Sequence, residues 1–523
     1  MIAMTLAQVA AVIGVDLPAG LDPAAQSVPV RSVEFDTRRV RPGALFVALR
    51  GDRVDGHDFV AQAAAAGAVA VLGSRPAPIS TELPMLVVPD RPDNAGVLDA
   101  LARLARASVT ALTADHGLQV IGVTGSSGKT STKDLIAAVL RTAVTDPDQV
   151  VAPPESFNNE LGHPYTALRA DESTRFLVLE LSARGVGHIA ALARVAPPRI
   201  GAVLNVGSAH LGEFGSVEKI AQAKSELVQA LPAAAAGSGT EPGAGGVAIL
   251  NADDPLVADM AQVTAAQVVL VGQAPGATIR ADGIGQDPAD RARFTLVTPE
   301  GSAPVALRVV GAHQVGNALT AAAVGRAVGM STEDVAAALS RAEPASKWRM
   351  DVTDLANGAT LINDAYNANP HSMKAALHSL ATIGRGRRTW AVLGEMAELG
   401  DDATAAHDRI GRLVVRLGID RLLVVEGPGA ATGAAVGGRT APRALHLGAH
   451  LEGSWSGESE LVPDTDAAVE VLLAELAPGD VVLVKASRSA GLERVALRLI
   501  DSVGIDTAGI DTAGIDGVEV MGQ

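Results

Sequence analysis

The sequence predicts an α/β protein built from three domains, with a mostly parallel sheet at its centre. The chain has 523 residues, enough for about three domains of ordinary size. Short apolar runs alternate with helical patterns over most of the chain, and this alternation is typical of parallel βαβ units. A Gly/Ser-rich turn separates one apolar run from the helical pattern that follows it. Such a turn indicates a phosphate-binding loop in the central sheet.

The predicted domain boundaries follow changes in this pattern. We expect an N-terminal α/β domain over residues 1–113, a central domain over 114–343 and a C-terminal domain over 344–503. Residues 504–523 repeat the sequence Gly-Ile-Asp-Thr-Ala, so we expect a low-complexity, disordered tail. The Ala/Gly/Ser-rich residues 232–246 predict a mobile surface insertion in the central domain.

The individual elements are predicted from local patterns. Thr5 and Gln8 form a capping-box pattern that opens a helix, and residues 42–49 predict a turn that feeds a strand. The C-terminal domain has a Rossmann-like alternation without the Gly-x-Gly-x-x-Gly fingerprint. The strands predicted for the central and C-terminal domains are residues 120–123, 176–181, 200–206, 247–250, 268–271, 360–363, 389–393, 422–425 and 481–484.

Composition and charge exclude several classes of function. Lys and Arg total 42 against 58 Asp and Glu, and the formal net charge of −16 argues against nucleic acid or an anionic membrane as a partner. The chain has no Cys, so disulfides and thiol catalysis are excluded. Asp16 interrupts the first apolar stretch, which has no basic segment before it, so no signal peptide is expected. The Ala/Val run at 63–73 is too short to cross a bilayer. We expect a soluble cytoplasmic protein.

The most informative motif is Thr124-Gly125-Ser126-Ser127-Gly128-Lys129-Thr130. It joins the apolar run 120–123 to a helical pattern at 131–140, so backbone N–H groups and the positive end of a helix dipole meet at the loop. Lys129 is expected to reach terminal phosphates and Thr130 to hold Mg²⁺. Val123 stands where the general motif has Gly. The loop therefore indicates a nucleotide triphosphate site of a variant kind.

Polar residues follow the predicted strands at the edge where parallel sheets bind ligands. Glu180 ends one strand and is either a Mg²⁺ ligand or a solvated strand end. His210 follows the next strand and is either a metal ligand or a loop histidine. Lys224 lies on the helical pattern 217–231, where a surface lysine is the ordinary interpretation.

Three further polar segments have a functional and a structural interpretation. Asn158-Asn159 is either a binding loop or a pair of turn formers. Lys485-Ala486-Ser487-Arg488 follows the strand 481–484, where it either binds a carboxylate or phosphate or begins a charged helix. Residues 364–370 form a rigid polar loop after the strand 360–363.

Taken in order, these motifs resemble those of the Mur ligase superfamily, and the resemblance covers nearly the whole chain. The phosphate loop matches the family's variant form, including the departure at Val123. The residues after Asn369-Pro370 are His371-Ser372, unlike the Asp-Asn-Pro-Arg of the diaminopimelate-adding branch. The other motifs in family order are Phe157-Asn158-Asn159-Glu160-Leu161-Gly162, Ala209-His210-Leu211-Gly212, Ala223-Lys224-Ser225-Glu226, Gly311-Ala312-His313-Gln314-Val315-Gly316-Asn317-Ala318, Asp364-Ala365-Tyr366-Asn367-Ala368-Asn369-Pro370, Leu393-Gly394-Glu395-Met396-Ala397-Glu398-Leu399-Gly400 and Lys485-Ala486-Ser487-Arg488.

The resemblance implies an ATP-dependent, amide-forming ligase of cytoplasmic peptidoglycan precursor synthesis. The Phe-Asn-Asn loop and Asn-Ala-Asn-Pro are typical of the branch that adds D-alanyl-D-alanine to UDP-N-acetylmuramoyl-tripeptide. ATP would phosphorylate the tripeptide carboxylate, and the dipeptide amine would attack the acyl phosphate. The family also implies a monomer with a UDP-binding N-terminal domain, a central P-loop-type ATPase domain and a C-terminal domain that closes over ATP. The tripeptide's third residue, diaminopimelate or lysine, stays open.

The same resemblance assigns roles to single residues. Lys129, His210 and Lys224 are predicted to be catalytic, with Lys224 carbamylated so that a cation becomes a carboxylate-like metal ligand. The predicted ligands of two Mg²⁺ ions are Thr130, Glu180, His210 and Lys224. The predicted nucleotide contacts are Thr124, Gly125, Ser126, Ser127, Gly128, Lys129, Thr130, Ser131, Asn317, Arg349 and Asp364. The predicted substrate contacts are Asp36, Thr37, Arg38, Gly51 and Asp52 in the UDP-binding loops, and Asn158, Asn159, Tyr366, Asn367, Asn369, Lys485 and Ser487 elsewhere.

Two other classes of protein stay open at this point. A folylpolyglutamate synthetase-like ligase usually has Gly-Lys-Gly-Ser where this chain has Gly128-Lys129-Thr130-Ser131. A P-loop NTPase switch would hydrolyse nucleotide without joining substrates, but the sequence contains no Asn-Lys-x-Asp guanine motif.

Overall fold

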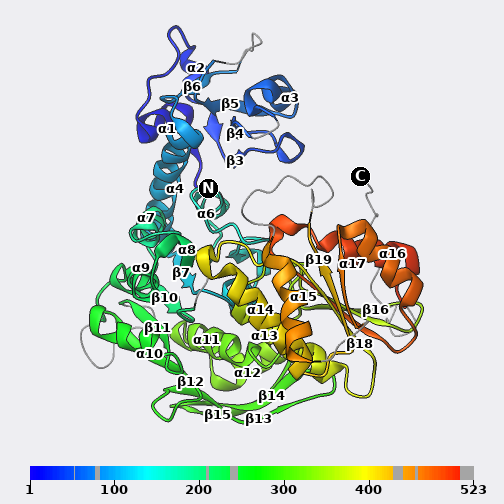
Figure 1. Cartoon of the computed structure of the whole chain (residues 1–523). Coiled ribbons are helices and arrows are strands. Elements are labelled where there is room, and N and C mark those ends of the chain that lie inside the picture. Colours follow the sequence, from blue (N-terminus) through cyan, green and yellow to red (C-terminus); the bar gives the residue numbers. More distant parts are fainter. Residues whose placement is uncertain are drawn as a thin grey trace.

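The computed structural model describes residues 1–51, 54–76, 83–207, 211–235, 245–427, 440–453 and 458–506. Within these residues the strands form a small two-stranded ribbon and three larger sheets, which follow one another along the chain (Figure 1). The larger sheets lie in residues 32–87, 119–310 and 351–485. The predicted α/β class is confirmed. The division into domains at residues 113, 343 and 503 stays a prediction.

The N-terminal sheet has its strands in the order β3-β4-β5-β6, and the neighbouring strands pair in parallel. β4 (Ala44–Val47) is buried at every position, which confirms the strand predicted after the turn at residue 42. α1 (Leu6–Ile13) begins with the predicted capping box between Thr5 and Gln8. The other elements here are β1 (Met4–Thr5), α2 (Pro23–Gln26), β2 (Pro29–Val30), β3 (Ser32–Glu34), η1 (Thr37–Arg39), η2 (Gly56–Phe59), α3 (Val60–Ala65), β5 (Ala68–Gly73), β6 (Met85–Val87) and η3 (Pro92–Asn94).

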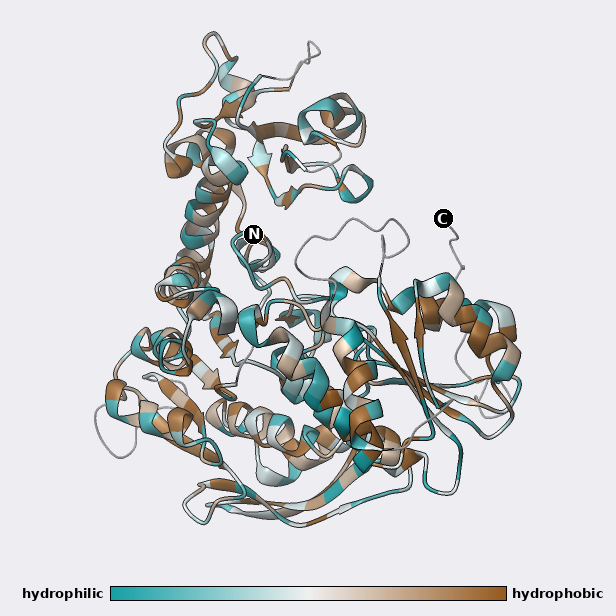
Figure 2. Ribbon diagram, in the orientation of Figure 1, coloured by the Kyte–Doolittle hydropathy of each residue, from teal (hydrophilic) through white to brown (hydrophobic). Residues whose placement is uncertain are grey.

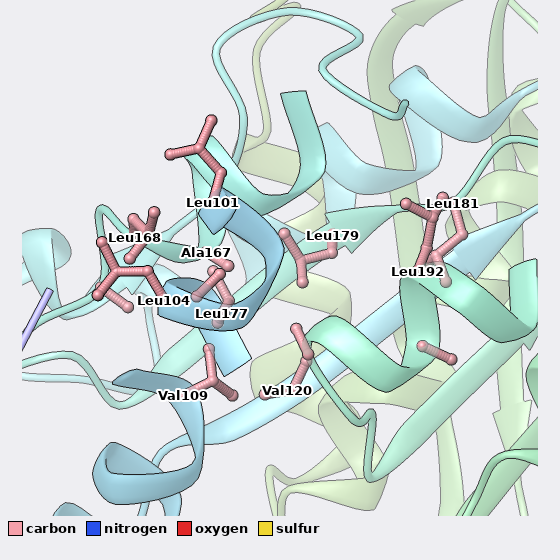
Figure 3. Close-up of a cluster of buried hydrophobic side chains, with 14 of the residues drawn as sticks. Leu101, Leu104, Val109, Val120, Ala167, Leu168, Leu177, Leu179, Leu181 and Leu192 are labelled. Atoms are coloured by element: carbon pink, nitrogen blue, oxygen red, sulfur yellow. The ribbon is translucent and has the colours of Figure 1, made fainter. Parts of the chain in front are cut away.

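The long helix α4 (Ala95–His116) joins the N-terminal part to the central sheet. It continues past residue 113, where the sequence predicted a domain boundary, and is capped by Gly117, whose φ of 70° lets its N–H reach the Leu112 carbonyl. One apolar cluster extends from this helix onto the central part, so α4 packs firmly between them. Figure 3 labels ten of its members: Leu101, Leu104, Val109, Val120, Ala167, Leu168, Leu177, Leu179, Leu181 and Leu192.

The central sheet has the strand order β15-β14-β13-β12-β11-β10-β7-β9-β8. Neighbouring strands from β8 to β13 pair in parallel, as predicted. The sheet also has an antiparallel edge that was not predicted, which consists of β13 (Ile279–Gln286), β14 (Arg291–Thr298) and β15 (Gly301–Val310). Buried and exposed residues alternate along β14 and β15, and this period of two was the available signal.

Helices cover both faces of the central sheet, because successive side chains of a strand point to opposite faces. In β7 (Gln119–Thr124), Val120 belongs to the cluster that includes α4, whereas Ile121 and Val123 pack with α5 (Lys129–Arg141) and α11 (Gln314–Ala327). The other elements of this part are η4 (Pro147–Gln149), β8 (Val150–Val151), α6 (Gly162–Ala167), β9 (Phe176–Glu180), α7 (His188–Val195), β10 (Ile200–Val203), α8 (Leu211–Phe214), α9 (Val217–Gln229), β11 (Val247–Asn251), α10 (Pro255–Ala258), η5 (Asp259–Val263), β12 (Gln267–Gly272) and α12 (Thr332–Arg341).

The C-terminal sheet has the strand order β16-β17-β21-β18-β19-β20, and only its edge pair β16–β17 is antiparallel among the described strands. Its strands are largely hydrophobic in Figure 2, between helices of mixed colour. Its elements are β16 (Asp351–Asp354), β17 (Thr360–Asn363), α13 (Pro370–Ile383), β18 (Thr389–Leu393), η6 (Gly400–Asp402), α14 (Ala403–Arg416), β19 (Arg421–Val425), α15 (Thr440–Glu452), β20 (Ser459–Val462), α16 (Thr465–Glu475), β21 (Val481–Lys485), η8 (Arg488–Ala490) and α17 (Glu493–Val503).

The predicted insertion and tail fall largely outside the described part of the chain, which lacks residues 236–244 and 507–523. Of the helices in the described part, none is both long and apolar enough to cross a bilayer.

Candidate active site

The phosphate loop lies at the carboxyl edge of the central sheet, where β7 ends at Thr124 and α5 begins at Lys129. The N–H groups of Ser126 and Ser127 both donate to Oδ1 of Asn205, each at 3.0 Å. Asn205 follows the neighbouring strand β10. The sequence predicted that these amides would point into the loop, but an amide side chain from the adjacent strand satisfies them.

Gly128 is a position in the loop that has no room for a side chain. Its φ is +82°, and an added Cβ would lie 2.8 Å from Oδ1 of Asn317 on α11. We expect Gly128→Ala to weaken ATP binding about ten-fold. The added Cβ would contact Asn317 and strain the backbone by about 1–2 kcal/mol, and the loop would have to move to relieve both. Titration calorimetry with ATP and Mg²⁺ measures this affinity.

Gly117→Ala is the matched control for this substitution. Gly117 also has a positive φ, of +70°, but an added Cβ there would have no atom within 4 Å. This variant is expected to lose some stability and keep its ATP affinity. Wild-type affinity in Gly128→Ala would contradict the prediction.

Lys129 and Asn317 border the loop on two sides. The Lys129 ammonium donates to the Gly125 carbonyl at 2.7 Å. Burial lowers the pKa of Lys129, while the nearby Glu180 carboxylate opposes that shift. Asn317 accepts from the Thr132 hydroxyl at 3.0 Å and donates to Gln314 at 2.8 Å. The predicted adenine contact therefore also braces the phosphate-loop helix.

Glu180 is a fully buried carboxylate beside the loop. One oxygen accepts from the Thr130 hydroxyl at 3.4 Å and from the Asn158 amide at 3.3 Å, while the other has no partner within the described residues. Burial raises the pKa of Glu180, and Lys133 and Lys129 lower it. An unpaired carboxylate oxygen next to a hydroxyl fits a hard cation such as Mg²⁺.

The two other predicted metal ligands are His210 and Lys224. His210 lies outside the described residues. Lys224 is buried on α9, and burial, together with the charge of Lys129, lowers its pKa to about 7. Within the described ranges the Lys224 ammonium makes no hydrogen bond or ion pair, and no group of three or more Asp, Glu and His side chains is arranged to hold a metal.

Residues from the C-terminal part form the opposite wall. The Arg349 guanidinium donates to the Thr130 hydroxyl at 3.2 Å and lies 4.2 Å from the ring centre of Tyr366. The Lys485 ammonium donates to Asp364 at 2.6 Å and to the Asn367 carbonyl at 2.8 Å. Lys485 at the end of β21 and Asp364 directly after β17 are thus paired in the wall that faces the phosphate loop.

These walls enclose one cavity of about 750 Å³. Most of the predicted site residues line it: Ser126, Ser127, Gly128, Lys129, Thr130, Ser131, Asn158, Asn159, Glu180, Asn317, Arg349, Asp364, Tyr366, Asn367, Asn369, Lys485 and Ser487. Thr124, Gly125 and Lys224 are not among its lining residues. The cavity places carboxylate, hydroxyl and basic groups around a phosphate loop, which is a suitable arrangement for transferring a phosphoryl group to a bound acid.

Three family models match successive parts of the chain. The model described as Mur ligase family, catalytic domain, matches residues 29–116, the Mur ligase middle domain matches 123–325, and the Mur ligase, glutamate ligase domain, matches 348–488. The chain belongs to the Mur ligase family. The family resemblance of the ordered motifs is therefore confirmed.

Individual relatives place this Mur ligase within the family. It is 51% identical to the UDP-N-acetylmuramoyl-tripeptide–D-alanyl-D-alanine ligase of Mycobacterium tuberculosis H37Rv, over 96% of this chain and 98% of the relative. The ligase of that name from Escherichia coli K12 is 35% identical, over 95% of this chain and 99% of the relative. MurF from Acinetobacter baumannii has a similar structure, with a TM-score of 0.76, 29% identity and 95% and 99% coverage. MurF from Thermotoga maritima in complex with ADP has a TM-score of 0.71, 25% identity and 92% and 99% coverage.

The predicted UDP-binding residues of this Mur ligase do not line the cavity. Asp36 caps η1, which starts at Thr37, and pairs with the Arg38 guanidinium at 2.8 Å. The Gly51 N–H donates to the Val54 carbonyl at 2.9 Å. Asp52 lies outside the described residues. That these loops bind the UDP group, at a distance from the cavity, stays a prediction.

One contact links the N-terminal sheet to the cavity of the Mur ligase. The Tyr165 hydroxyl on α6 donates to Glu34 at the end of β3, at 2.9 Å, and the Tyr165 ring lies 5.9 Å from the ring of Phe157. Phe157 directly precedes the cavity-lining Asn158 and Asn159. Tyr165 therefore connects the N-terminal sheet to the loop that carries these asparagines.

Several cavity residues of this Mur ligase were missed as functional candidates. Asn205 and Ser156 contact the loop and Thr130, and Nδ1 of His371 lies 3.4 Å from the Ser127 hydroxyl. His371 follows Asn369, which caps α13 by accepting from the Ser372 N–H at 2.9 Å. Its place in the first turn of a helix after a predicted binding loop was the available signal.

His163 is expected to make the Mur ligase sensitive to acid. It is fully buried next to the Glu180 carbonyl, and burial lowers its pKa from the usual 6.5 to about 4. Between these two values the unfolded chain binds a proton that the folded chain does not, so stability is complete above pH 6.5 and falls as the pH drops toward 4. The expected loss is about 3 kcal/mol, measured by urea unfolding across this range. His163→Gln is expected to be less stable at pH 8 but to lose less on acidification, and an unchanged pH slope would contradict this.

Proposed function

We propose that this Mur ligase joins D-alanyl-D-alanine to the C-terminal carboxylate of UDP-N-acetylmuramoyl-tripeptide and converts ATP to ADP and phosphate. The observation that carries the proposal is that one cavity contains the phosphate loop, the buried Glu180 and the paired Asp364 and Lys485 of the C-terminal part. The relatives that cover almost its whole length and carry that name support the same substrates.

The proposed reaction has two steps. A carboxylate oxygen of the tripeptide attacks the γ-phosphorus of ATP, and the bond to the β-phosphate oxygen breaks to release ADP. The amine of the dipeptide then attacks the acyl carbon, loses a proton, and phosphate leaves as the amide forms. Carboxylate oxygen is a poor leaving group until it is phosphorylated, so charge builds on phosphoryl and acyl oxygens and clustered cations are the main catalytic need.

We assign residues of this chain to these charges. Lys129 contacts the β- and γ-phosphates, and residues 124–131 surround them once the N–H groups of Ser126 and Ser127 exchange Asn205 for phosphate oxygen. Arg349 and Asp364 contact the nucleotide from the C-terminal side, and Asn317 contacts the adenine. Lys485 lies near the incoming dipeptide, together with Ser487, Tyr366, Asn367 and Asn369.

The metal and the modified lysine are further parts of the proposal. Mg²⁺ would neutralise phosphate charge when held by Thr130 and Glu180, whose unpaired oxygen fits it. His210 and a carbamylated Lys224 are proposed ligands of a second ion. A carbamate forms when the neutral amine attacks CO₂ and loses a proton, and a lysine with a pKa of about 7 is substantially neutral at physiological pH.

The remaining substrate contacts and the setting are inferred from the family. The UDP group would bind Asp36, Thr37, Arg38, Gly51 and Asp52, and the peptide would pass Asn158 and Asn159. We further propose that the enzyme acts as a monomer in the cytoplasm and that its C-terminal part closes over ATP.

The proposal is tested with the purified chain, ATP, Mg²⁺ and UDP-N-acetylmuramoyl-tripeptide. Phosphate release that depends on D-alanyl-D-alanine, with a pentapeptide product in the mass spectrum, is the expected result. Parallel reactions with lysine- and diaminopimelate-containing tripeptides identify the preferred third residue. Phosphate release that ignores the dipeptide would favour an NTPase switch, and turnover of a folate with glutamate would favour the other ligase class.

A further inference from the structure

Lys133 is a buried cation on the phosphate-loop helix to which no role has been given. It lies one turn after Lys129 and is only 1% exposed. Its ammonium is 2.5 Å from the Asp134 carboxylate and donates to the Pro153 carbonyl at 2.7 Å and to the Ser346 hydroxyl at 3.4 Å. An ammonium has three protons, so these three acceptors satisfy it completely.

The partners of Lys133 belong to separate segments. Asp134 is its neighbour on α5, Pro153 lies in the segment after β8, and Ser346 lies in the linker of residues 342–350 between α12 and β16. This linker connects the central sheet to the C-terminal sheet. One side chain therefore joins the phosphate-loop helix to a loop 20 residues away and to a linker 213 residues away.

Each segment contacts Thr130, at the N-terminal end of the helix, through a residue three positions after its own contact with Lys133. Ser156 follows Pro153, and its hydroxyl lies 2.7 Å from that of Thr130. Arg349 follows Ser346, and its guanidinium donates to Thr130 at 3.2 Å and to Ser156 at 3.3 Å. Lys133 thus contacts two segments, and each of these segments contacts Thr130 three residues later.

Stability alone does not explain the burial of the Lys133 ammonium, so what its contacts hold in place becomes important. Removing an ammonium from water is unfavourable, and an apolar side chain of similar size often serves stability as well as a buried ion pair does. An apolar residue, however, would release the Pro153 carbonyl and the Ser346 hydroxyl. Lys133 also supplies positive charge near Glu180 and favours its ionised form.

We propose that Lys133 is a positioning residue for the ligation reaction: it fastens the 342–350 linker and the Pro153 segment to the phosphate-loop helix, and so holds Arg349 and Ser156 against Thr130. The inference rests on the proposed function for its catalytic consequence. Its structural part, that the linker is held by this ammonium, does not depend on which acid is ligated.

The test compares Lys133→Met, Ser346→Ala and the control Arg141→Met in the full chain. Lys133→Met removes all three contacts, whereas Ser346→Ala removes only the linker contact. Arg141 is an exposed cation at the other end of the same helix. Lys347 is exposed in the linker, so the rate of tryptic cleavage after Lys347 reports linker release without any substrate.

We expect cleavage after Lys347 to accelerate about ten-fold in Lys133→Met and about three-fold in Ser346→Ala, because cleavage follows the open population. The Kd of a non-hydrolysable ATP analogue should rise by similar factors, since affinity falls with the fraction of chains whose Arg349 is in place. The KM for ATP should rise more than kcat falls. Arg141→Met should match the wild type.

Wild-type cleavage and nucleotide affinity in both test variants would overturn the proposal. If Lys133→Met fails to fold, Ser346→Ala alone decides between the two outcomes. Faster cleavage in a chain whose wild type does not ligate D-alanyl-D-alanine would support the holding role of Lys133 and refute the proposed function, so the two failures are distinguishable.

Discussion

Lys224→Ala is expected to lower kcat/KM for ligation about 10³-fold, and short-chain carboxylic acids are expected to restore part of the activity. The physical reason is that a buried Lys224 ammonium near Lys129 would repel Mg²⁺, whereas the proposed carbamate would supply a negative metal ligand. Truncation leaves a space that acetate or propionate can fill with the same carboxylate. Phosphate release at increasing acetate concentration measures the rescue.

Lys219→Ala is the control, because Lys219 lies on the same helix α9 and is exposed. It should have wild-type activity and no response to acetate. Wild-type activity in Lys224→Ala would exclude a catalytic role for this lysine. A loss without rescue, combined with a mass of the intact wild-type chain that is unchanged by bicarbonate, would exclude the carbamate.

Lys129→Ala is expected to reduce kcat/KM for ATP by about 10²–10³-fold while the chain stays folded. The Lys129 ammonium is the cation of the phosphate loop and lies near Glu180. The loop should keep its shape, because Asn205 holds the N–H groups of Ser126 and Ser127. Steady-state kinetics at varied ATP, with circular dichroism for folding, give the result.

Arg141→Ala is the control for loss of a cation from α5. It should change neither kcat nor KM for ATP appreciably. Lys129→Arg should recover little, because a planar guanidinium has to fit a loop shaped around an ammonium. A Lys129→Ala enzyme with a normal KM and kcat for ATP would show that the phosphates bind elsewhere.

The parts of the fold that the sequence predicted depend on neighbours in the chain. The capping box of Thr5 and Gln8, the strand before the phosphate loop and the helix after it are local patterns, and each is present. Parallel pairing of the central strands followed from their alternation with helices. The antiparallel β14 and β15 were not predicted, although buried and exposed residues alternate regularly along both strands.

The candidate site divides in the same way. Lys129, Thr130 and Glu180 were placed near one another because the carboxyl ends of parallel strands meet at one edge. Nothing local showed that Asn205 would occupy the loop amides or that Arg349 would reach Thr130 across 219 residues. Lys224 was predicted to lie at the metal site, but it is not among the residues that line the cavity, so the experiment above tests that role.

By itself the sequence determined the order of the elements, the chemistry of the phosphate loop and, through its ordered motifs, the family. Only the tertiary structure decided how the central and C-terminal parts face each other, with Arg349 donating to Thr130 and Lys133 joined to Ser346. The physical reason is that hydrogen bonds and buried charges depend on where distant segments meet in space, whereas local propensity acts only over a few successive residues.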